Sequence, residues 1–418
     1  MITLKNARVL IKDKFEKLDI LIDNGKIIKL DKDINEGKVY DFKDKIIAPA
    51  FMDPHVHLRE PGFEKKETIY CGSRAAARGG YTKIFSMPNL NPNPSRRESL
   101  DLQLEIIKRD SIIDIYPIGS ITIDNSGNNV LSRVDEIQND VIGFSDDGKG
   151  VYHSNTMYEI MNLAKKYGKP IISHSEDRDL LYGGVITEGT YSEKNGFKGI
   201  VDIAETSELA RNLVLAKKTG CHFHLCHTSC RDSVDLIRFY KAMGCHVTAE
   251  VTPHHLVLNE TDLKDDGNYK MNPPLMSVDN QEALLEGLLD GTIDCIATDH
   301  APHTLEEKSR GLNGSPFGIA GLETSFPILY TKLVLNNKIS LEQLLYKMSG
   351  AISDIFDVDS NEIRVGNDAN IVVIDIEKEF TIDKNTFLSK GKNTPFDGWK
   401  VKGLINMTIC KGEIVYEL

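Results

Sequence analysis

The stretch that decides the fold is Asp53-Pro54-His55-Val56-His57-Leu58-Arg59-Glu60-Pro61-Gly62, which follows the apolar run 46–52. An apolar run of this kind predicts a buried β-strand, and strand alternation then points the imidazoles of His55 and His57 to the same side. Two neutral imidazoles on one side suit a borderline-soft divalent ion such as zinc. The guanidinium of Arg59 would suit a carboxylate beside that metal. Because a lone His-x-His pair is a weak signal, its weight depends on the rest of the chain.

Eight strand-like apolar runs alternate with helical patterns along most of the chain. The runs are Ile46–His55, Thr82–Met87, Ile113–Gly119, Val141–Ser145, Pro170–His174, Cys221–His227, His246–Val251 and Ile293–Thr298. Segments such as Ser154–Tyr167 and Glu205–Thr219 have helical composition between them. This alternation predicts the α/β class and a (β/α)8 TIM barrel over residues 48–359. Residues 1–47 and 360–418 are β-rich and short, so we expect them to form one composite β-sandwich.

The overall composition narrows the possible functions. The formal net charge of −12 argues against a nucleic-acid-binding surface, which needs a basic face. No run of about 18 apolar residues predicts a membrane span, and the N-terminus has no signal-peptide pattern. The seven cysteines follow no disulfide pattern, so we expect them to be reduced, in a cytoplasmic protein.

Polar side chains follow the predicted strands at their carboxyl ends, where the chemistry of such a barrel lies. The strand ends carry His55, His57, Asn89, Asp146, Asp147, His174, His227, Asp299 and His303. Four of these histidines and two of these acids, converging on one mouth, suit a two-metal hydrolytic site whose ions share a bridging hydroxide. The sequence therefore predicts a metal-dependent barrel.

Some neighbouring candidates leave alternatives open. His222, His224 and His227 share one strand run, and the position at the mouth favours His227, with the other two structural. Asp146 and Asp147 are adjacent, and only one can face inward from a regular strand. Cys221, Cys226 and Cys230 interleave with these histidines, and buried cysteine is favoured over a separate zinc site. His254 and His255 would point to opposite sides of a strand, so we expect them to be structural.

Four motifs carry a family resemblance. Asp53–Gly62, Met87-Pro88-Asn89, Asn272-Pro273-Pro274 and Ala297–His303 closely resemble the motifs of dihydroorotases. More specifically, they resemble class I (type I) of the metal-dependent amidohydrolase superfamily, and the resemblance covers essentially the whole chain. It implies two Zn²⁺ ions per subunit.

The resemblance also implies the ligand set. His55 and His57 would bind the more buried metal with Asp299 near it, His174 and His227 would bind the second, and Asp147 would bridge the two. Asp146 remains an alternative bridge. Many superfamily members use a carbamylated lysine there, but residues 141–144 contain none, and Lys149 is the only lysine nearby.

The activity implied is the reversible cyclisation of N-carbamoyl-L-aspartate to L-dihydroorotate in de novo pyrimidine (UMP) biosynthesis. A zinc-bridging hydroxide would attack the ring amide, with Asp299 as general acid and base. Substrate contacts would come from Arg59, Asn89 and His303, and by motif from Asn272 and the backbone of Phe317 and Gly318. Residues 303–318 are long enough to act as a lid.

Two other functions compete with this interpretation. One is a hydantoinase or allantoinase, which shares the metals and cyclic-amide hydrolysis but needs no grip on a carboxylate. The other is an inactive relative that serves as a scaffold. We expect a small-molecule substrate, no nucleic acid or membrane partner, and either a homo-oligomer or association with another pyrimidine-pathway enzyme.

Overall fold

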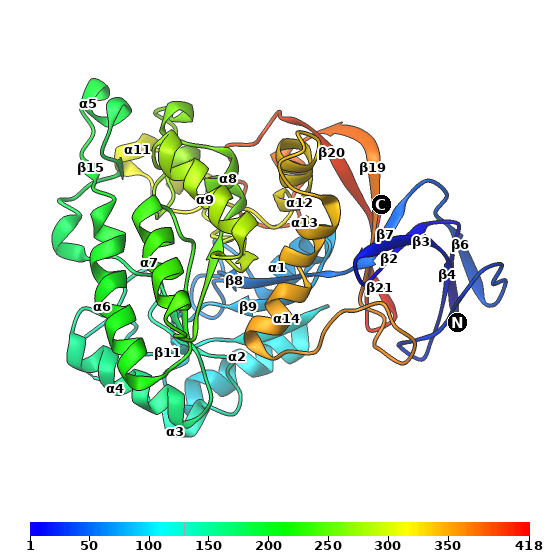
Figure 1. The fold of residues 1–418 in the computed structure, drawn as a ribbon, viewed down its shortest axis with the longest axis horizontal. Helices are drawn as coiled ribbons and strands as arrows, with labels where there is room; N and C mark the ends of the chain where they lie inside the picture. Colours follow the sequence, from blue (N-terminus) through cyan, green and yellow to red (C-terminus); the bar gives the residue numbers. More distant parts are fainter. Residues whose placement is uncertain (129) are drawn as a thin grey trace.

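The computed structural model describes residues 1–128 and 130–418, and parallel strands form a barrel within them (Figure 1). The barrel strands are β8 (Phe51–Val56), β9 (Tyr81–Ser86), β10 (Asp114–Pro117) with β11 (Gly119–Ser120), β12 (Phe144–Ser145), β13 (Ile171–Ser173), β16 (Phe223–Leu225), β17 (Val247–Val251) and β18 (Cys295–Ile296). The ends of this order meet where Val56 pairs with His300 in parallel. The predicted TIM barrel is confirmed.

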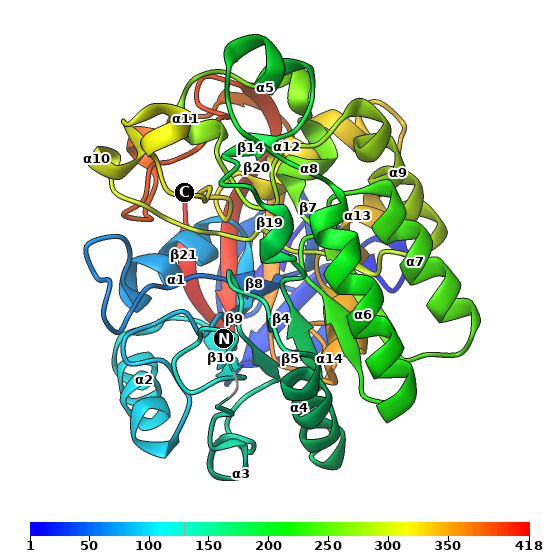
Figure 2. The same ribbon diagram turned by 90° about the vertical axis from the view of Figure 1, so that its left-hand side faces the viewer.

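Helices surround the strands, as Figure 2 shows for α2, α4, α6 and α7. The longer ones are α1 (Ile69–Arg78), α2 (Arg97–Asp110), α4 (Ser154–Lys166), α6 (Ile203–Thr219), α7 (Arg231–Ala242), α9 (Val278–Asp290), α13 (Leu341–Lys347) and α14 (Gly350–Phe356). The shorter ones are α3 (Val134–Ile137), α5 (Thr190–Asn195), α8 (Pro253–Val257), α10 (Leu305–Lys308), α11 (Gly311–Gly314) and α12 (Ser325–Leu329).

Local sequence signals set the ends of these helices. The Ser277 side chain caps α9 by accepting a hydrogen bond from the backbone N–H of Asn280, and Gly291 ends that helix with φ +83°. None of the helices in the described residues is long and apolar enough to cross a bilayer.

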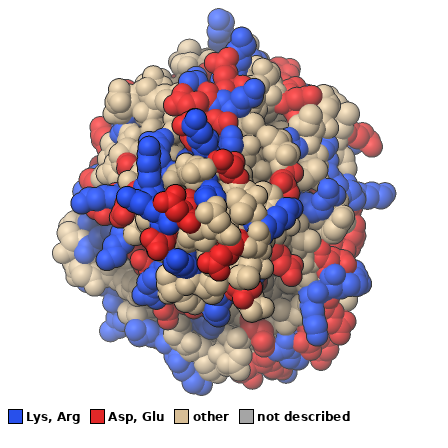
Figure 3. Space-filling model, turned by 90° about the vertical axis from the view of Figure 1, so that its right-hand side faces the viewer, with Lys and Arg blue, Asp and Glu red and all other residues tan. Residues whose placement is uncertain are grey.

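Both ends of the chain form two further sheets beside the barrel, on the right in Figure 1. One sheet has the order β5-β4-β1-β6, and the other has the order β21-β20-β19-β7-β2-β3. Their strands are β1 (Ile2–Lys5), β2 (Arg8–Ile11), β3 (Lys14–Lys17), β4 (Asp19–Asp23), β5 (Lys26–Asp31), β6 (Lys38–Asp41), β7 (Ile46–Pro49), β19 (Ile371–Thr381), β20 (Lys400–Cys410) and β21 (Glu413–Glu417). Leu4, Ile20, Ile47, Ile371 and Met407 pack in one buried cluster of these strands. On this face of the molecule, acidic and basic side chains are interspersed (Figure 3). Domain boundaries at residues 47/48 and 359/360 stay a prediction.

The first predicted strand is in fact two strands. Ile46–Pro49 forms β7 and pairs with β19 and β2 in the terminal sheet, whereas Phe51–Val56 forms β8 and pairs with β9 in the barrel. Proline cannot donate to a sheet, and Pro49 lies where the chain leaves one sheet for the other. The single apolar run therefore contributes one strand to the terminal sheet and one to the barrel. Its composition alone does not reveal this division.

The connection between β19 and β20 runs back to the barrel mouth. There the amide of Asn393 donates hydrogen bonds to the carbonyl oxygens of Ala301 and Gly318, both at 3.0 Å. Its Oδ1 atom accepts one from the backbone N–H of His303 at 2.9 Å. Residues from the C-terminal part of the chain thus help to shape the mouth.

Candidate metal centre and substrate pocket

The first group of candidate ligands lies at the end of β8. His55 is fully buried, and its Nε2 atom lies 3.3 Å from Oδ1 of Asp299 and 3.5 Å from Oδ1 of Asp147. His57 Nε2 lies 3.0 Å from the same Asp299 oxygen and 3.5 Å from Asp147 Oδ2. His55, His57 and Asp299 can therefore share one cation.

A second group lies beside the first and shares Asp147. His174 Nδ1 and His227 Nε2 are 2.8 Å apart and lie 3.8 Å and 3.7 Å from Asp147 Oδ1. His55 Nε2 and Asp147 Oδ1 are buried and have no hydrogen-bond partner. Buried polar atoms normally have hydrogen-bond partners. Two unpartnered atoms of types that bind metals, so close together, therefore fit a bound metal ion.

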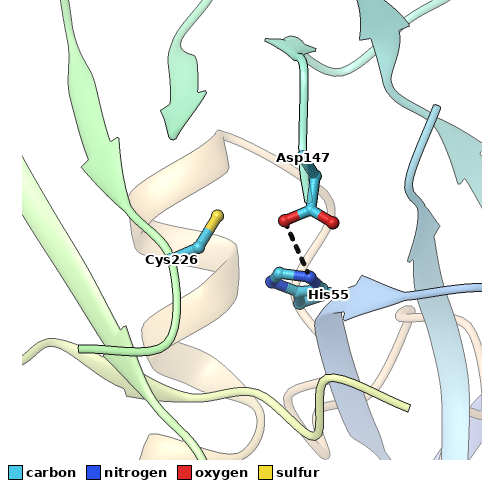
Figure 4. Close-up of side chains that lie close together, drawn as sticks. All are labelled: His55, Asp147 and Cys226. Atoms are coloured by element: carbon cyan, nitrogen blue, oxygen red, sulfur yellow. Dashed lines mark ion pairs between the residues drawn. The ribbon is translucent and has the colours of Figure 1, made fainter. Parts of the chain in front are cut away.

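Figure 4 shows Asp147 pointing toward the ring of His55, with the thiol of Cys226 nearby. These three side chains form another potential ligand group, and burial raises the pKa of the Cys226 thiol. The potential ligand groups among the described residues include neither Cys221 nor Cys230. The interleaved Cys and His residues of the sixth strand run therefore do not assemble into one separate cluster.

The sequence left the roles of His222 and Asp146 open, and the structure places both side chains outside the ligand groups. His222 Nε2 lies 2.8 Å from Oγ1 of Thr248, and its ring stacks on His246. Asp146 accepts hydrogen bonds from the backbone N–H groups of Ile121 and Thr122, away from the ligand groups.

The remaining alternatives lie outside the ligand groups as well. Lys149 is exposed and lines a different cavity. The strand assumed for His254 and His255 is wrong, because Thr252 caps a short helix, α8, in which Pro253 occupies the first turn.

Three residues of the site have left-handed backbone conformations, which are rare outside glycine. The φ angles are +63° at Arg59, +32° at His227 and +47° at Asp299. Such strain is concentrated at functional sites in proteins. It also explains why alternation is a poor guide to His227, since β16 ends at Leu225 and the chain then turns out of the strand.

Glu250 belongs to this centre, although the sequence reasoning missed it. Its Oε1 atom accepts hydrogen bonds from His55 Nδ1 at 2.7 Å and from the backbone N–H of His227 at 3.2 Å, while Oε2 lies 3.1 Å from His224 Nε2. Burial alone would raise the pKa of this carboxyl, but His55 and His224 lower it to about 2. An acid within the otherwise apolar end of a barrel strand was the available signal.

Asp299 lies at the end of the last barrel strand beside both histidines of β8. Burial would raise its pKa, but His55 and His57 hold the pKa of Asp299 well below its ordinary value. Glu176 acts on the other ligand group, because its carboxylate lies 3.6 Å from His174 Nε2. It raises the pKa of His174 to about 9 against the effect of burial. The neighbouring charges thus favour the ionised form of Asp299 and the protonated form of His174, whereas burial lowers the pKa of His57.

The ligand groups open into a cavity of about 260 Å³. It is lined by His57, Arg59, Asn89, Asp147, Gly148, His174, His227, Asn272, Asp299, Ala301, His303, Phe317 and Gly318. All six residues predicted for substrate binding are in this lining. Asn89 also accepts a hydrogen bond from His57 Nδ1 at 2.7 Å, so it orients one of the histidines.

Arg59 and His303 form the charged side of the cavity. Burial lowers the pKa of Arg59, whose Nη2 atom lies 3.4 Å from His303 Nε2. His303 Nε2 donates to the carbonyl oxygen of Phe317 at 2.9 Å, and Lys66 Nζ lies 3.3 Å from its Nδ1 atom. Burial together with Arg59 lowers the pKa of His303 to about 3, so its ring is neutral. This side of the cavity thus offers the Arg59 guanidinium beside a neutral imidazole.

Comparison with known proteins identifies the family of this chain. A family model described as Dihydro-orotase-like matches residues 44–233. A dihydroorotase of Fusobacterium nucleatum subsp. nucleatum is 50% identical over 416 residues, which cover 99% of this chain and 98% of the relative. A dihydroorotase of Listeria innocua serovar 6a is 47% identical over 420 residues, which cover 100% of this chain and 99% of the relative.

Solved structures with the same fold include a hydantoinase and a dihydropyrimidinase. An L-hydantoinase (dihydropyrimidinase) from Arthrobacter aurescens aligns with a TM-score of 0.89 and 25% identity over 100% of this chain and 96% of that chain. A dihydropyrimidinase from Brevibacillus agri aligns with a TM-score of 0.88 and 25% identity, covering 99% and 95%. Since the full-length sequence relatives are the more similar, the chain belongs to the dihydroorotase family.

Proposed function

We propose that this enzyme catalyses the reversible cyclisation of N-carbamoyl-L-aspartate to L-dihydroorotate in pyrimidine biosynthesis. The observation that carries the proposal is the position of Arg59, a half-buried guanidinium that lines the cavity onto which the candidate metal ligands open. Ring closure needs an anionic substrate to be held in one orientation beside the reacting carboxyl group. Full-length identity of 50% to a dihydroorotase supports the same assignment.

We propose two Zn²⁺ ions as the metals of this site. His55, His57 and Asp299 would hold one ion, His174 and His227 the other, and Asp147 would be shared. Bound there, the ions would supply a water of lowered pKa and polarise the amide carbonyl. The unpartnered donor atoms of His55 and Asp147 support this ligand set.

In this proposal Asp299 moves the proton. In the hydrolytic direction its carboxylate takes a proton from the attacking water and gives it to the leaving ring nitrogen. In the direction of ring closure it takes a proton from the ureido nitrogen. The lowered pKa keeps the Asp299 carboxylate ionised at neutral pH, which is the form that can accept a proton.

Arg59 would grip the substrate carboxylate with its planar fork, which can donate two parallel hydrogen bonds. Asn89 and His303 would add hydrogen bonds, and Asn272 with the backbone of Phe317 and Gly318 would contact the ring or ureido edge. The segment 303–318 would fold over the mouth and exclude water. Reduced hydrogen exchange in this segment on addition of dihydroorotate would support the lid, and unchanged exchange would contradict it.

A hydantoinase is the main competitor, because solved hydantoinases share the fold. Steady-state assays with dihydroorotate, hydantoin and allantoin separate the two, since a hydantoinase has no use for a carboxylate grip. We expect dihydroorotate to have the highest kcat/KM. A higher kcat/KM for hydantoin or allantoin would overturn the proposal. Failure to bind zinc with stable co-purification of a partner would instead support an inactive scaffold.

We further propose that the enzyme acts in the cytoplasm as a homo-oligomer or with another enzyme of pyrimidine synthesis. The supporting argument is chemical: the substrate proposed above is a small charged metabolite. Size-exclusion chromatography with light scattering on the purified protein tests self-association directly.

A further inference from the structure

Lys308 has an ammonium group that is buried behind the pocket. It is the last residue of α10, and only 3% of the residue is exposed. Its Nζ atom donates hydrogen bonds to three backbone carbonyl oxygens, those of Lys270 at 3.0 Å, Pro316 at 3.0 Å and Gly318 at 2.8 Å. A lysine ammonium has three N–H donors, so this cage satisfies all of them.

The three carbonyls belong to two separate segments that together form one wall of the pocket. Lys270 lies two residues before Asn272, whereas Pro316 and Gly318 flank Phe317. Asn272, Phe317 and Gly318 line the cavity, and Lys308 does not. The ammonium therefore acts from behind the wall rather than from its surface.

The two segments also contact each other directly, in a tight arrangement. The backbone N–H of Gly318 donates to the carbonyl oxygen of Lys270 at 3.0 Å. Gly318 has φ +142°, and a Cβ added there would lie 2.7 Å from the carbonyl oxygen of Ala301. Only glycine fits this close approach. Because Gly318 lines the cavity, a small shift of its backbone would change the shape of the cavity wall.

The physical role of the ammonium follows from the direction of the carbonyls. Three carbonyl dipoles that aim at one point repel one another unless a cationic donor lies between them. A buried ammonium is in turn costly unless its donors are satisfied, so the lysine and the two segments stabilise each other. Burial and the neighbouring charge of Lys270 lower the pKa of Lys308 to about 7, and only its ammonium form supplies all three donors.

We propose that Lys308 is a positioning residue that aims the backbone of Phe317 and Gly318, together with Asn272, at the substrate. This inference rests on the proposed function, because it assigns that wall to the binding of carbamoyl-aspartate or dihydroorotate. Lys308 itself touches no substrate. Its loss loosens the wall and weakens substrate binding, while the metal ligands, none of which is hydrogen-bonded to Lys308, keep their arrangement.

The test compares Lys308→Met with Lys347→Met in the purified, metal-loaded enzyme. Lys347 is a matched control because its Nζ atom also donates to a backbone carbonyl, that of Ile293 at 2.9 Å, at the opposite end of the barrel strands. We expect Lys308→Met to raise KM for carbamoyl-aspartate about tenfold, with kcat within about threefold and metal content unchanged. Lys347→Met should keep the wild-type KM.

A second readout needs no turnover. Hydrogen exchange at the Gly318 amide should be faster in Lys308→Met than in the wild type and in Lys347→Met. If Lys308→Met does not fold, Lys308→Gln keeps part of the donor set and is measured in the same way. Wild-type KM or wild-type exchange at Gly318 in a folded variant would overturn the proposal. If the wild type itself did not turn over dihydroorotate, the proposed function would fail, and the exchange readout would still decide the role of Lys308.

Discussion

Replacing Glu250 with glutamine should weaken metal binding without dismantling the centre. Glu250 Oε1 accepts hydrogen bonds from His55 Nδ1 at 2.7 Å and from the His227 backbone N–H at 3.2 Å, and an amide oxygen can accept both. The new NH₂ group would face His224 Nε2. That ring can accept by changing tautomer, because the hydroxyl of Thr248 lies 2.8 Å from its Nδ1 atom. Glu250→Gln therefore keeps every contact and removes only the charge.

The magnitude follows from that lost charge. A hydrogen bond to a charged group contributes about 1.5–3 kcal/mol and a neutral one about 1 kcal/mol, so the His55 contact weakens by about 0.5–2 kcal/mol. Because His55 would bind the metal through Nε2, a less polarised ring is a poorer ligand. The expected loss is about tenfold in metal affinity, within the range found for partners of metal-bound histidines.

Metal content after equilibration with chelators of graded strength measures this affinity. The matched control is Glu323→Gln, which removes another buried carboxylate, one that accepts from the backbone N–H groups of Leu388 and Ser389 far from the ligand groups. Thermal unfolding of the metal-free proteins checks that both variants are folded. Wild-type metal affinity in a folded Glu250→Gln variant would refute the argument that Glu250 orients His55.

Asp299→Asn should lower kcat at least about 100-fold with a small change in KM, because the proton carrier is lost; near-normal turnover of the metal-loaded variant would remove Asp299 from its role. Arg59→Lys should raise KM for carbamoyl-aspartate about tenfold or more, because an ammonium cannot make the two parallel bonds of a guanidinium; an unchanged KM would contradict the carboxylate grip. Acid should destabilise the fold through His222 and His255, whose pKa values burial lowers to about 3 and about 4. The unfolded chain takes up these protons below about pH 6.5 and the folded chain does not, so stability falls as the pH drops, by about 2 kcal/mol per histidine at pH 5. Urea unfolding at pH 7 and pH 5 should show a smaller loss for His222→Gln than for the wild type, and equal losses would contradict the assignment.

The sequence predicted the barrel and the family because both leave local signals. Eight apolar runs and four motifs can be recognised without knowing which strands are neighbours. The same local rules failed where the chain changes sheet or leaves a strand. Pro49 divides one apparent strand into two, and the left-handed turn at His227 removes that residue from the alternation of β16.

Residues that act through another residue were the hardest to predict. Glu250 is 195 residues from His55 in the sequence, and no spacing rule links them. Lys308 lies in a charged stretch, Glu306-Glu307-Lys308, that looks like an ordinary solvated turn of helix. Its function depends on three backbone carbonyls whose positions only the folded chain defines.

Because the β19–β20 connection returns to the barrel mouth, substitutions in the terminal sheets and in the barrel have to remain compatible with each other. Ser389 and Lys390 are hydrogen-bonded to the buried carboxylate of Glu67, and Asn393 holds Ala301 and Gly318 in place. A chimera with the barrel of this chain and the C-terminal strands of a distant relative would lose these hydrogen bonds at the barrel mouth. The terminal sheets and the barrel are therefore expected to be exchanged between relatives only as a unit.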